Sequence, residues 1–203
     1  QPIALYGAEV WGLGSAAKHC EKVQLFALEK FLGVEQQTPN DLVYGETNRY
    51  PIYINSIMSC IRYWLKLTMM DDTRLPRKAY KMLLDLDARG KRNWVTDIRC
   101  KLYQHGFGFV WTNQAVQNVK LFLQEFKDRL ILGRWQEWDF HVENSDRFNV
   151  YRTFCTVHDV AVYLKMNLDR HLKFIMTRFR CGISEIATHH YRYKKHSSLD
   201  LIC

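Results

Sequence analysis

The stretch PIYINSIMSCIRYWLKLT, residues 51–68, decides the fold class. Its large apolar side chains recur every three to four positions, which is the spacing of one face of an α-helix. Pro51 suits the opening of such a helix, because its fixed φ matches a first helical turn. The apolar positions of this predicted helix are Ile54, Ile57, Met58, Ile61, Trp64, Leu65 and Thr68.

The same period continues on both sides of this stretch. One predicted helix ends at Gly33, and its apolar face consists of Cys20, Val23, Ala27 and Phe31. Thr38 and Pro39 predict a short helix, with the threonine as N-cap and the proline in the first position. Before Gly90 the apolar positions of a further helix are Ala79, Met82, Leu83 and Leu86. Asn93 is a suitable cap for the next one, whose apolar positions are Trp94, Ile98 and Leu102.

The longest helix is predicted over residues 114–132. Its apolar positions are Val116, Val119, Leu123, Phe126 and Leu130, which cover only two heptads and so favour a bundle over a coiled coil. A last helix ends at Gly182, with apolar positions Leu168, Leu172, Ile175, Met176 and Phe179. The apolar run 107–111 is too short and too glycine-interrupted to predict a strand. The sequence therefore predicts an all-α chain, an irregular multi-helix bundle.

Charge narrows the kinds of partner. The chain has 203 residues, enough for one large or two small domains, and carries a formal net charge of +8. Between residues 165 and 196 eight Lys and Arg residues face two acidic ones. Such a segment favours a polyanionic partner, of which nucleic acid is the commonest, although a merely solvated basic face is the alternative. Tyr191 and Tyr193 interleave with basic residues in a pattern that suits either base stacking or a solvated tail.

The six cysteines are scattered and form no CxxC pair. In a chain of this size we expect reduced thiols, and hence an intracellular protein. No apolar stretch reaches the roughly 18 residues of a membrane span, and no signal peptide is evident.

Catalytic patterns are weak. Asp71 and Asp72 follow two methionines where a reverse-transcriptase motif would have an aromatic residue, so we interpret them as a helix exit and turn. The spacing of His189, His190, His196 and Cys203 does not match a complete zinc site. A zinc site that begins at Cys203 and continues beyond it stays open. The chain opens inside an apolar run without an initiator Met, which suggests a piece of a longer polypeptide.

Several segments resemble the region that follows the catalytic palm in reverse transcriptases of non-LTR (LINE-type) retrotransposons. PIALYGAEVWG (residues 2–12) is similar to that family's PILLYGSEVWG segment, which opens the thumb. The segments that follow in the family's order are EKV (21–23), FLGV (31–34), TPN (38–40), VYGE (43–46) and RYPIYI (49–54). TRFRCG (177–182) resembles an element that precedes a Cys/His zinc knuckle, but the next residues, ISEIAT (183–188), depart from the family pattern.

The resemblance implies a thumb-like segment 1–47, a post-thumb helical domain 48–182 and a basic tail 183–203 that leads into a truncated knuckle-like region. The Mg²⁺-binding carboxylates of the parent polymerase would lie in its palm, upstream of Gln1, and zinc would bind beyond Cys203. The implied role is to hold RNA and DNA, as a template–primer duplex, without reading sequence. The family's location would be the nucleus and cytoplasm.

The residues that we expect to contact phosphates are basic ones near the end of the chain. A first cluster consists of Arg170, Lys173, Arg178 and Arg180, and a second of Arg192, Lys194 and Lys195. Further candidates on the thumb helix are Lys18, Lys22 and Lys30. Two other functions remain open: a stand-alone helical scaffold that docks an acidic protein, and a sequence-specific DNA binder of helix-turn-helix type.

Overall fold

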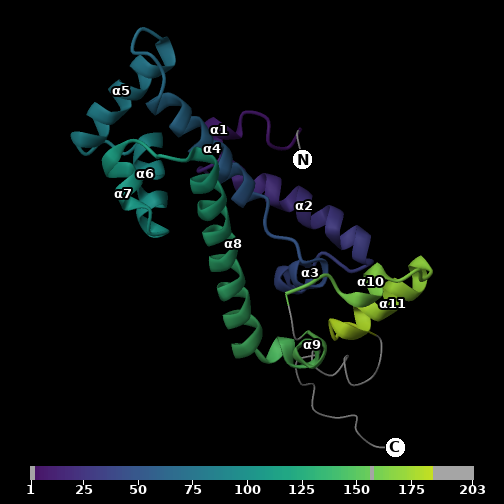
Figure 1. Cartoon of the computed structure of the whole chain (residues 1–203). Helices are drawn as coiled ribbons and strands as arrows, with labels where there is room; N and C mark the ends of the chain where they lie inside the picture. The colour runs from purple at the N-terminus through teal and green to yellow at the C-terminus, as the bar shows by residue number, and fades with distance from the viewer. Residues whose placement is uncertain (1–2, 156–157, 185–203) are drawn as a thin grey trace, which may run out of the picture. The chain divides into compact units, whose positions relative to one another are not determined.

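The computed structural model describes residues 3–155 and 158–184, and within these ranges it contains helices and no strand (Figure 1). The all-α prediction is confirmed. The helices are α1 Ala8–Trp11, α2 Ala16–Leu32, α3 Asn40–Thr47, α4 Tyr53–Thr68, α5 Leu75–Ala88, α6 Trp94–Gln104, α7 Gly108–Asn113, α8 Val119–Asn144, the 3-10 turn η1 Asp146–Phe148, α9 Asn149–Phe154, α10 Val162–Lys165 and α11 Arg170–Arg180.

The chain divides into two compact units, each built from two separate segments. Unit 1 comprises Gln1–Gln24 and Tyr50–Arg134, and unit 2 comprises Leu25–Arg49 and Trp135–Cys203. The helices α2 and α8 each supply residues to both units. The predicted domains, by contrast, are consecutive segments of the chain, with boundaries after residues 47 and 182. These boundaries concern the parent polypeptide and stay a prediction.

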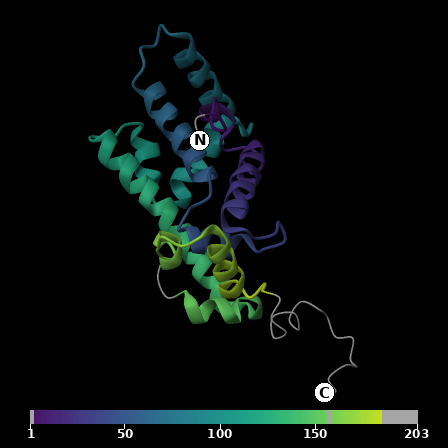
Figure 2. The ribbon, with the colours of Figure 1, turned by 90° about the vertical axis from the view of Figure 1, so that its right-hand side faces the viewer.

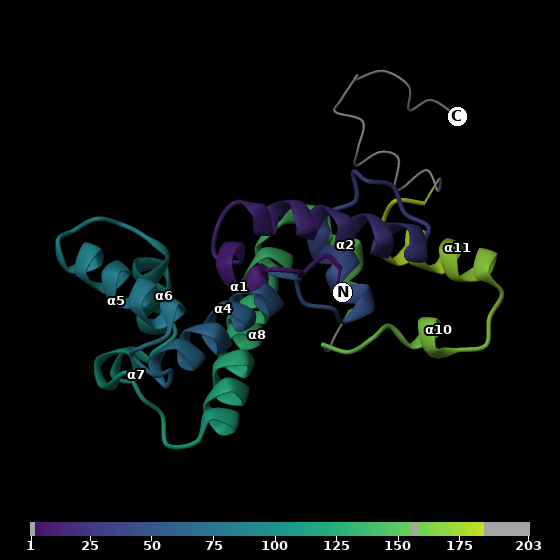
Figure 3. The same cartoon turned by 90° about the horizontal axis from the view of Figure 1, so that it is seen from above.

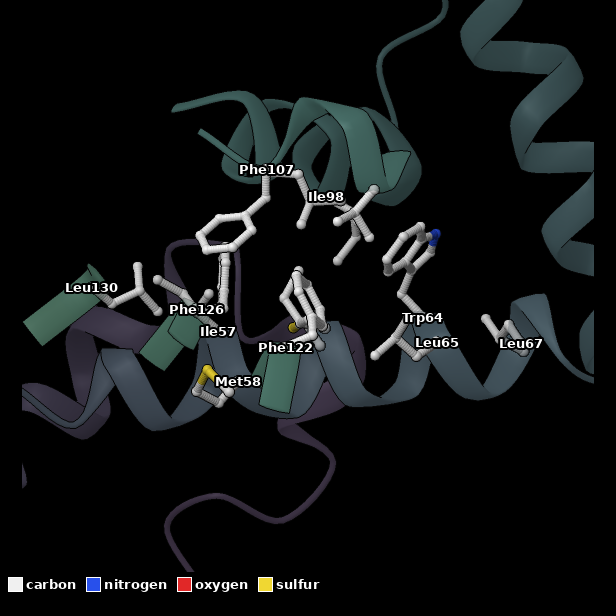
Figure 4. Close-up of a cluster of buried hydrophobic side chains, with 14 of the residues drawn as sticks. Ile57, Met58, Trp64, Leu65, Leu67, Ile98, Phe107, Phe122, Phe126 and Leu130 are labelled. Carbon is white, nitrogen blue, oxygen red and sulfur yellow. The ribbon is translucent and has the colours of Figure 1, made fainter. Parts of the chain in front are cut away.

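Unit 1 is organised around α4. The predicted apolar stripe is buried from Ile54 to Leu65, which confirms the helix and its face, while Thr68 is half-buried at its end. Against this stripe pack Ile98 of α6, Phe107 before α7, and Phe122 and Phe126 of α8 (Figure 4). Full burial of each such side chain stabilises the fold by roughly 1.5–3 kcal/mol relative to exposure.

The short helix α1 lies very close to α4. Ser56 Oγ donates a hydrogen bond to the carbonyl of Gly12 (3.0 Å), and Cys60 Sγ lies 3.1 Å from the carbonyl of Ala8. A Cβ atom at Gly12 would fall 2.8 Å from the carbonyl oxygen of Ser56 and 2.4 Å from that of Ala8. Only glycine therefore permits this approach of the two backbones.

At the far end of unit 1, α4 and α5 form a helical hairpin (Figure 2), and α5 packs beside α6 (Figure 3). The predicted cap of α6 is confirmed. The side chain of Asn93 accepts a hydrogen bond from the backbone N–H of Val95 (2.8 Å), and Thr96 Oγ1 accepts one from the backbone N–H of Asn93 (3.0 Å). This capping box satisfies backbone donors that the first helical turn leaves unpaired.

Several helix details differ from expectation. The short helix begins at Asn40, and no side chain caps it, so the predicted cap by Thr38 is wrong. The longest described helix starts at Val119 and runs to Asn144, well past the predicted end at residue 132, because Trp138 and Val142 continue its buried face within unit 2. The run 107–111 lies mostly in α7.

The helix α2 is present where predicted but buries another face. The residues Val23, Ala27 and Phe31 are exposed, whereas Leu25 and Leu32 are buried. Both sets of positions follow a helical period, so the period alone cannot choose between them.

The helix α5 likewise exposes most of its predicted apolar face: Leu83 is half-buried against the core of unit 1, but Ala79, Met82 and Leu86 are exposed. Its buried residue is Tyr80, whose hydroxyl accepts a hydrogen bond from Trp64 Nε1 (2.9 Å) and donates one to Gln114 (2.6 Å). The polar tip of the tyrosine is thus satisfied inside unit 1, as a buried hydroxyl requires.

Candidate nucleic-acid interface

The predicted and observed faces also differ in α11. It forms as expected between the capping carboxylate of Asp169, which accepts a hydrogen bond from the N–H of His171 (2.8 Å), and Gly182 with its positive φ of 69°. However, the apolar side of the helix is exposed, and the buried residue is Thr177. The exposed apolar residues are Leu172, Ile175, Met176 and Phe179.

The reason for this orientation is a buried ion pair in unit 2. Glu46 of α3 is fully buried, and its carboxylate accepts hydrogen bonds from Arg180 Nε at 2.9 and 3.1 Å. Tyr163 donates a further hydrogen bond to Glu46 (2.6 Å), and its hydroxyl lies 2.7 Å from Thr177 Oγ1. Burial and the nearby Glu46 charge raise the pKa of Tyr163, so the phenol stays a donor. A buried carboxylate needs such partners, because an unpaired one is strongly destabilising.

The four predicted phosphate contacts of α11 therefore do not share one accessible face. Besides Arg180, Lys173 also turns inward, and its ammonium donates to the carbonyl of Leu164 (3.2 Å). Arg178 and Arg170 remain exposed. Arg178 Nε donates to the carbonyl of Gly33 (3.1 Å), and the Arg170 guanidinium lies 5.1 Å from the centre of the Phe174 ring. We therefore interpret Arg180 and Lys173 as internal anchors.

The remaining predicted residues fall into two groups. Arg192, Lys194, Lys195 and Cys203 lie outside the described residues. Lys18, Lys22 and Lys30 are all exposed on α2, and Lys30 Nζ lies 5.5 Å from the centre of the Phe26 ring.

Lys18 also lines a hollow of about 300 Å³ in unit 1, together with Glu21. Burial raises the pKa of Glu21, and the backbone N–H groups of Tyr53 and Ile52 oppose that rise. This acidic side chain thus shares the hollow with two lysines, Lys18 and Lys101.

A cluster of cations that the sequence did not single out lies on unit 1. Arg62, Lys66 and Arg74 line a hollow of about 430 Å³, and all three side chains are exposed. Arg62 and Lys66 are one turn apart on the outward side of α4, while Arg74 precedes α5. None of the three forms an ion pair with the described residues. We call this hollow the basic groove; its apolar lining consists of Leu65, Met69, Met70, Val119 and Leu123.

Two acidic residues lie in the turn beside the basic groove, and they are held by other partners. Asp72 accepts hydrogen bonds from Arg77 (3.1 Å) and Lys81 (2.7 Å), and these contacts lower its pKa. Asp71 accepts from the hydroxyl and the backbone N–H of Thr73, which likewise lowers its pKa. The pair forms the predicted helix exit and turn, and the charge of Asp72 is offset locally.

The sequence contains a short pattern that indicates part of the basic groove. Arg62 and Lys66 are the two charged residues of α4 and stand four positions apart, so they share one side of the helix. That Arg74 joins them depends on the turn after α4, which the helical period does not specify. The most basic segment, residues 165–196, is also far more conspicuous in the sequence than this smaller cluster.

Other kinds of site receive no support from the described ranges. Within residues 3–155 and 158–184 no group of His, Cys, Asp and Glu side chains is arranged to hold a metal ion. In the same ranges no helix is long and apolar enough to cross a membrane. Comparisons with protein-family models, with curated proteins and with solved structures found no match.

Proposed function

We propose that this chain is a nucleic-acid-holding, non-catalytic helical part of a reverse transcriptase of the non-LTR retrotransposon type. The observation that carries the binding function is the basic groove, where Arg62, Lys66 and Arg74 present three cations with no carboxylate bound to them among the described residues. The assignment to a polymerase rests on the resemblance of the sequence segments to that family.

Phosphate gripping explains the groove better than a structural role does. Structural arginines in this chain, such as Arg99 with Asp87 at 3.0 Å, are held by a carboxylate. The groove cations instead leave their donors to solvent, next to a hollow open to a ligand. Lysine and arginine arranged in this way bind phosphate oxygens and position a duplex without reading its bases. Arg170 and Arg178 of α11 are a second, separate pair of exposed cations in unit 2.

The two alternative functions predict different binding. A sequence-specific DNA reader binds its site typically 10³-fold or more tighter than other sequences. A scaffold for an acidic protein binds no nucleic acid. The proposed holder binds RNA–DNA hybrids of unrelated sequence with nearly equal affinity, and that affinity falls steeply with salt.

The groove is tested by a pair of matched variants. Arg62→Gln with Lys66→Gln removes two cations from the groove, and Lys91→Gln with Arg129→Gln removes two exposed cations elsewhere on unit 1. We expect the groove variant to bind an RNA–DNA hybrid at least tenfold more weakly than the wild type in fluorescence anisotropy at fixed low salt, because each lost phosphate contact is worth roughly 1 kcal/mol.

The control variant has the same net charge as the groove variant. We expect it to lose much less affinity, since the cations that it lacks do not line the groove. Equal losses in both variants would mean that the net charge of the chain, and not the groove, governs binding. Unchanged far-ultraviolet circular dichroism in both variants excludes unfolding as the cause.

A further inference from the structure

The helix α5 exposes a second apolar face that its packing in unit 1 leaves uncovered. Leu75 is 79% exposed, Met82 66% and Leu86 41%, and Ala79 is exposed as well. These four positions are spaced by four, three and four residues, so they form one straight stripe along the helix. The buried side of α5 is different and carries Tyr80. In Figure 3 α5 lies at the outer end of unit 1, beside α6.

The charges beside the stripe are self-complementary. Lys78 and Asp85 lie on the same flank of the stripe, two helical turns apart, which is too far for them to pair with one another. Neither residue forms an ion pair with the described residues, although the neighbouring Lys81 binds Asp72 at 2.7 Å. Lys78 and Asp85 thus lie on one edge of the apolar stripe as a positive and a negative charge that have no ion-pair partner among the described residues.

A second copy of α5 that runs in the opposite direction covers the apolar stripe and also pairs the two charges beside it. In an antiparallel pair related by a two-fold axis, Leu75 of one copy lies against Leu86 of the other, and Ala79 lies against Met82. The same register places Lys78 of each copy beside Asp85 of its partner, so the interface contains the ion pair twice. A parallel two-fold pair would instead turn this flank of the two copies to opposite sides of the interface, so Lys78 of one copy would not meet Asp85 of the other.

We propose that α5 is a self-association surface through which two copies of this chain form an antiparallel dimer. The stripe covers one face of a helix of 14 residues, so the contact is smaller than the about 1,200 Å² of a standard stable interface. The dimer is therefore a weak one, which assembles with rising protein concentration. The basic groove lies on other residues, and the two proposals stand independently.

Charge reversal provides the sharpest test. We expect the purified full chain, free of nucleic acid, to show a rise in weight-average mass with concentration in sedimentation equilibrium. Lys78→Glu leaves two acids facing each other in the dimer, and Asp85→Lys leaves two lysines, so each variant alone should associate at least tenfold more weakly. An equimolar mixture of the two variants should associate again, because the glutamate introduced in one copy then faces the lysine introduced in the other.

Two further variants test the apolar stripe itself. Met82→Glu should abolish association, because it places a charge in the apolar stripe, whereas Lys91→Glu outside the stripe should leave it unchanged. A chain that stays monomeric at every concentration would overturn the proposal. A dimer that is indifferent to both charge reversals would overturn it as well, since that dimer would use another surface.

Discussion

The clearest residue-scale finding is that Arg180 serves the interior of unit 2. Its guanidinium binds Glu46, a residue fully removed from solvent and 134 positions earlier in the chain. Without the arginine, Tyr163 is the one side chain among the described residues that still donates a hydrogen bond to this buried carboxylate. We expect Arg180→Ala to lower the free energy of unfolding in urea by about 3 kcal/mol or more.

Two companion variants separate this effect from surface charge. Arg178→Ala removes an exposed cation of the same helix together with one hydrogen bond, to the carbonyl of Gly33, and should change the stability by about 1 kcal/mol or less. In the background of Glu46→Gln the further loss of Arg180 should cost much less than it does alone, because no buried charge is left behind. If Arg180→Ala unfolds at the same urea concentration as Arg178→Ala, the ion pair is not the anchor that we describe.

A second residue-scale prediction concerns pH. Burial raises the pKa of the Cys60 thiol from its ordinary 9.0 to about 11. The folded chain therefore disfavours the thiolate, and the resulting stability is fully present below pH 9 and is lost as the pH rises through 11. The difference of about two pKa units corresponds to roughly 3 kcal/mol.

Comparison of the wild type with Cys60→Ala isolates this contribution. Both chains contain the buried tyrosines, and burial raises the pKa of one of them, Tyr80, as well. The stability that these tyrosines lose at alkaline pH is the same in both chains, so it cancels in the comparison. We expect the unfolding free energy of the wild type to fall more steeply than that of the variant between about pH 9 and about pH 11, as measured by urea titration. If the unfolding free energies of the two chains changed with pH in parallel, the raised pKa of the Cys60 thiol would be contradicted.

At the scale of the helical element, the capping of α6 is a direct consequence of local sequence. Asn93 caps the helix, and its side-chain amide also donates to the carbonyl of Leu83 at 3.0 Å. We expect Asn93→Ala to lower the unfolding free energy by about 1 kcal/mol or more. Asn113→Ala, in an exposed position at the end of α7, is the matched control and should be nearly neutral. Equal effects would show that the cap contributes nothing.

The elements also show where sequence reasoning succeeds and where it stops. Asn93 and the stripe of α4 were predictable because capping and burial there involve residues close in sequence. The orientation of α11 was not, because it is set by Glu46, whose distance along the chain leaves no trace in a helical period. Along α2 two apolar stripes follow the same period, and only the tertiary contacts of Leu25 and Leu32 decide which one is buried.

The candidate site follows the same division. The excess of positive charge is evident from composition, and it favoured nucleic acid as a partner. Which cations face solvent depends on packing: Lys173 turns inward, and Arg62 and Lys66 face outward on α4. The groove also needs Arg74 from a turn, a position that neither charge counting nor helical spacing specifies.

At the scale of the whole molecule, the net charge of +8 and the groove together predict how binding responds to salt. A protein that contacts phosphates releases condensed counterions, so the logarithm of its affinity falls linearly with the logarithm of salt concentration. The slope is about −0.9 per phosphate contact on duplex DNA. Three contacts from the groove alone give a slope of about −2.7, which is a loss of roughly fortyfold between about 50 and about 200 mM salt.

The most direct test of phosphate holding is this slope, measured by anisotropy for the full chain with two RNA–DNA hybrids of unrelated sequence. We predict a slope of about −2.7 or steeper on both hybrids, with affinities within a few-fold of each other, and a slope shallower by about 1.8 for the Arg62→Gln, Lys66→Gln variant. A folded, helical chain that binds neither hybrid, or binds with a slope near zero, would contradict the proposal that this protein holds nucleic acid by its phosphates.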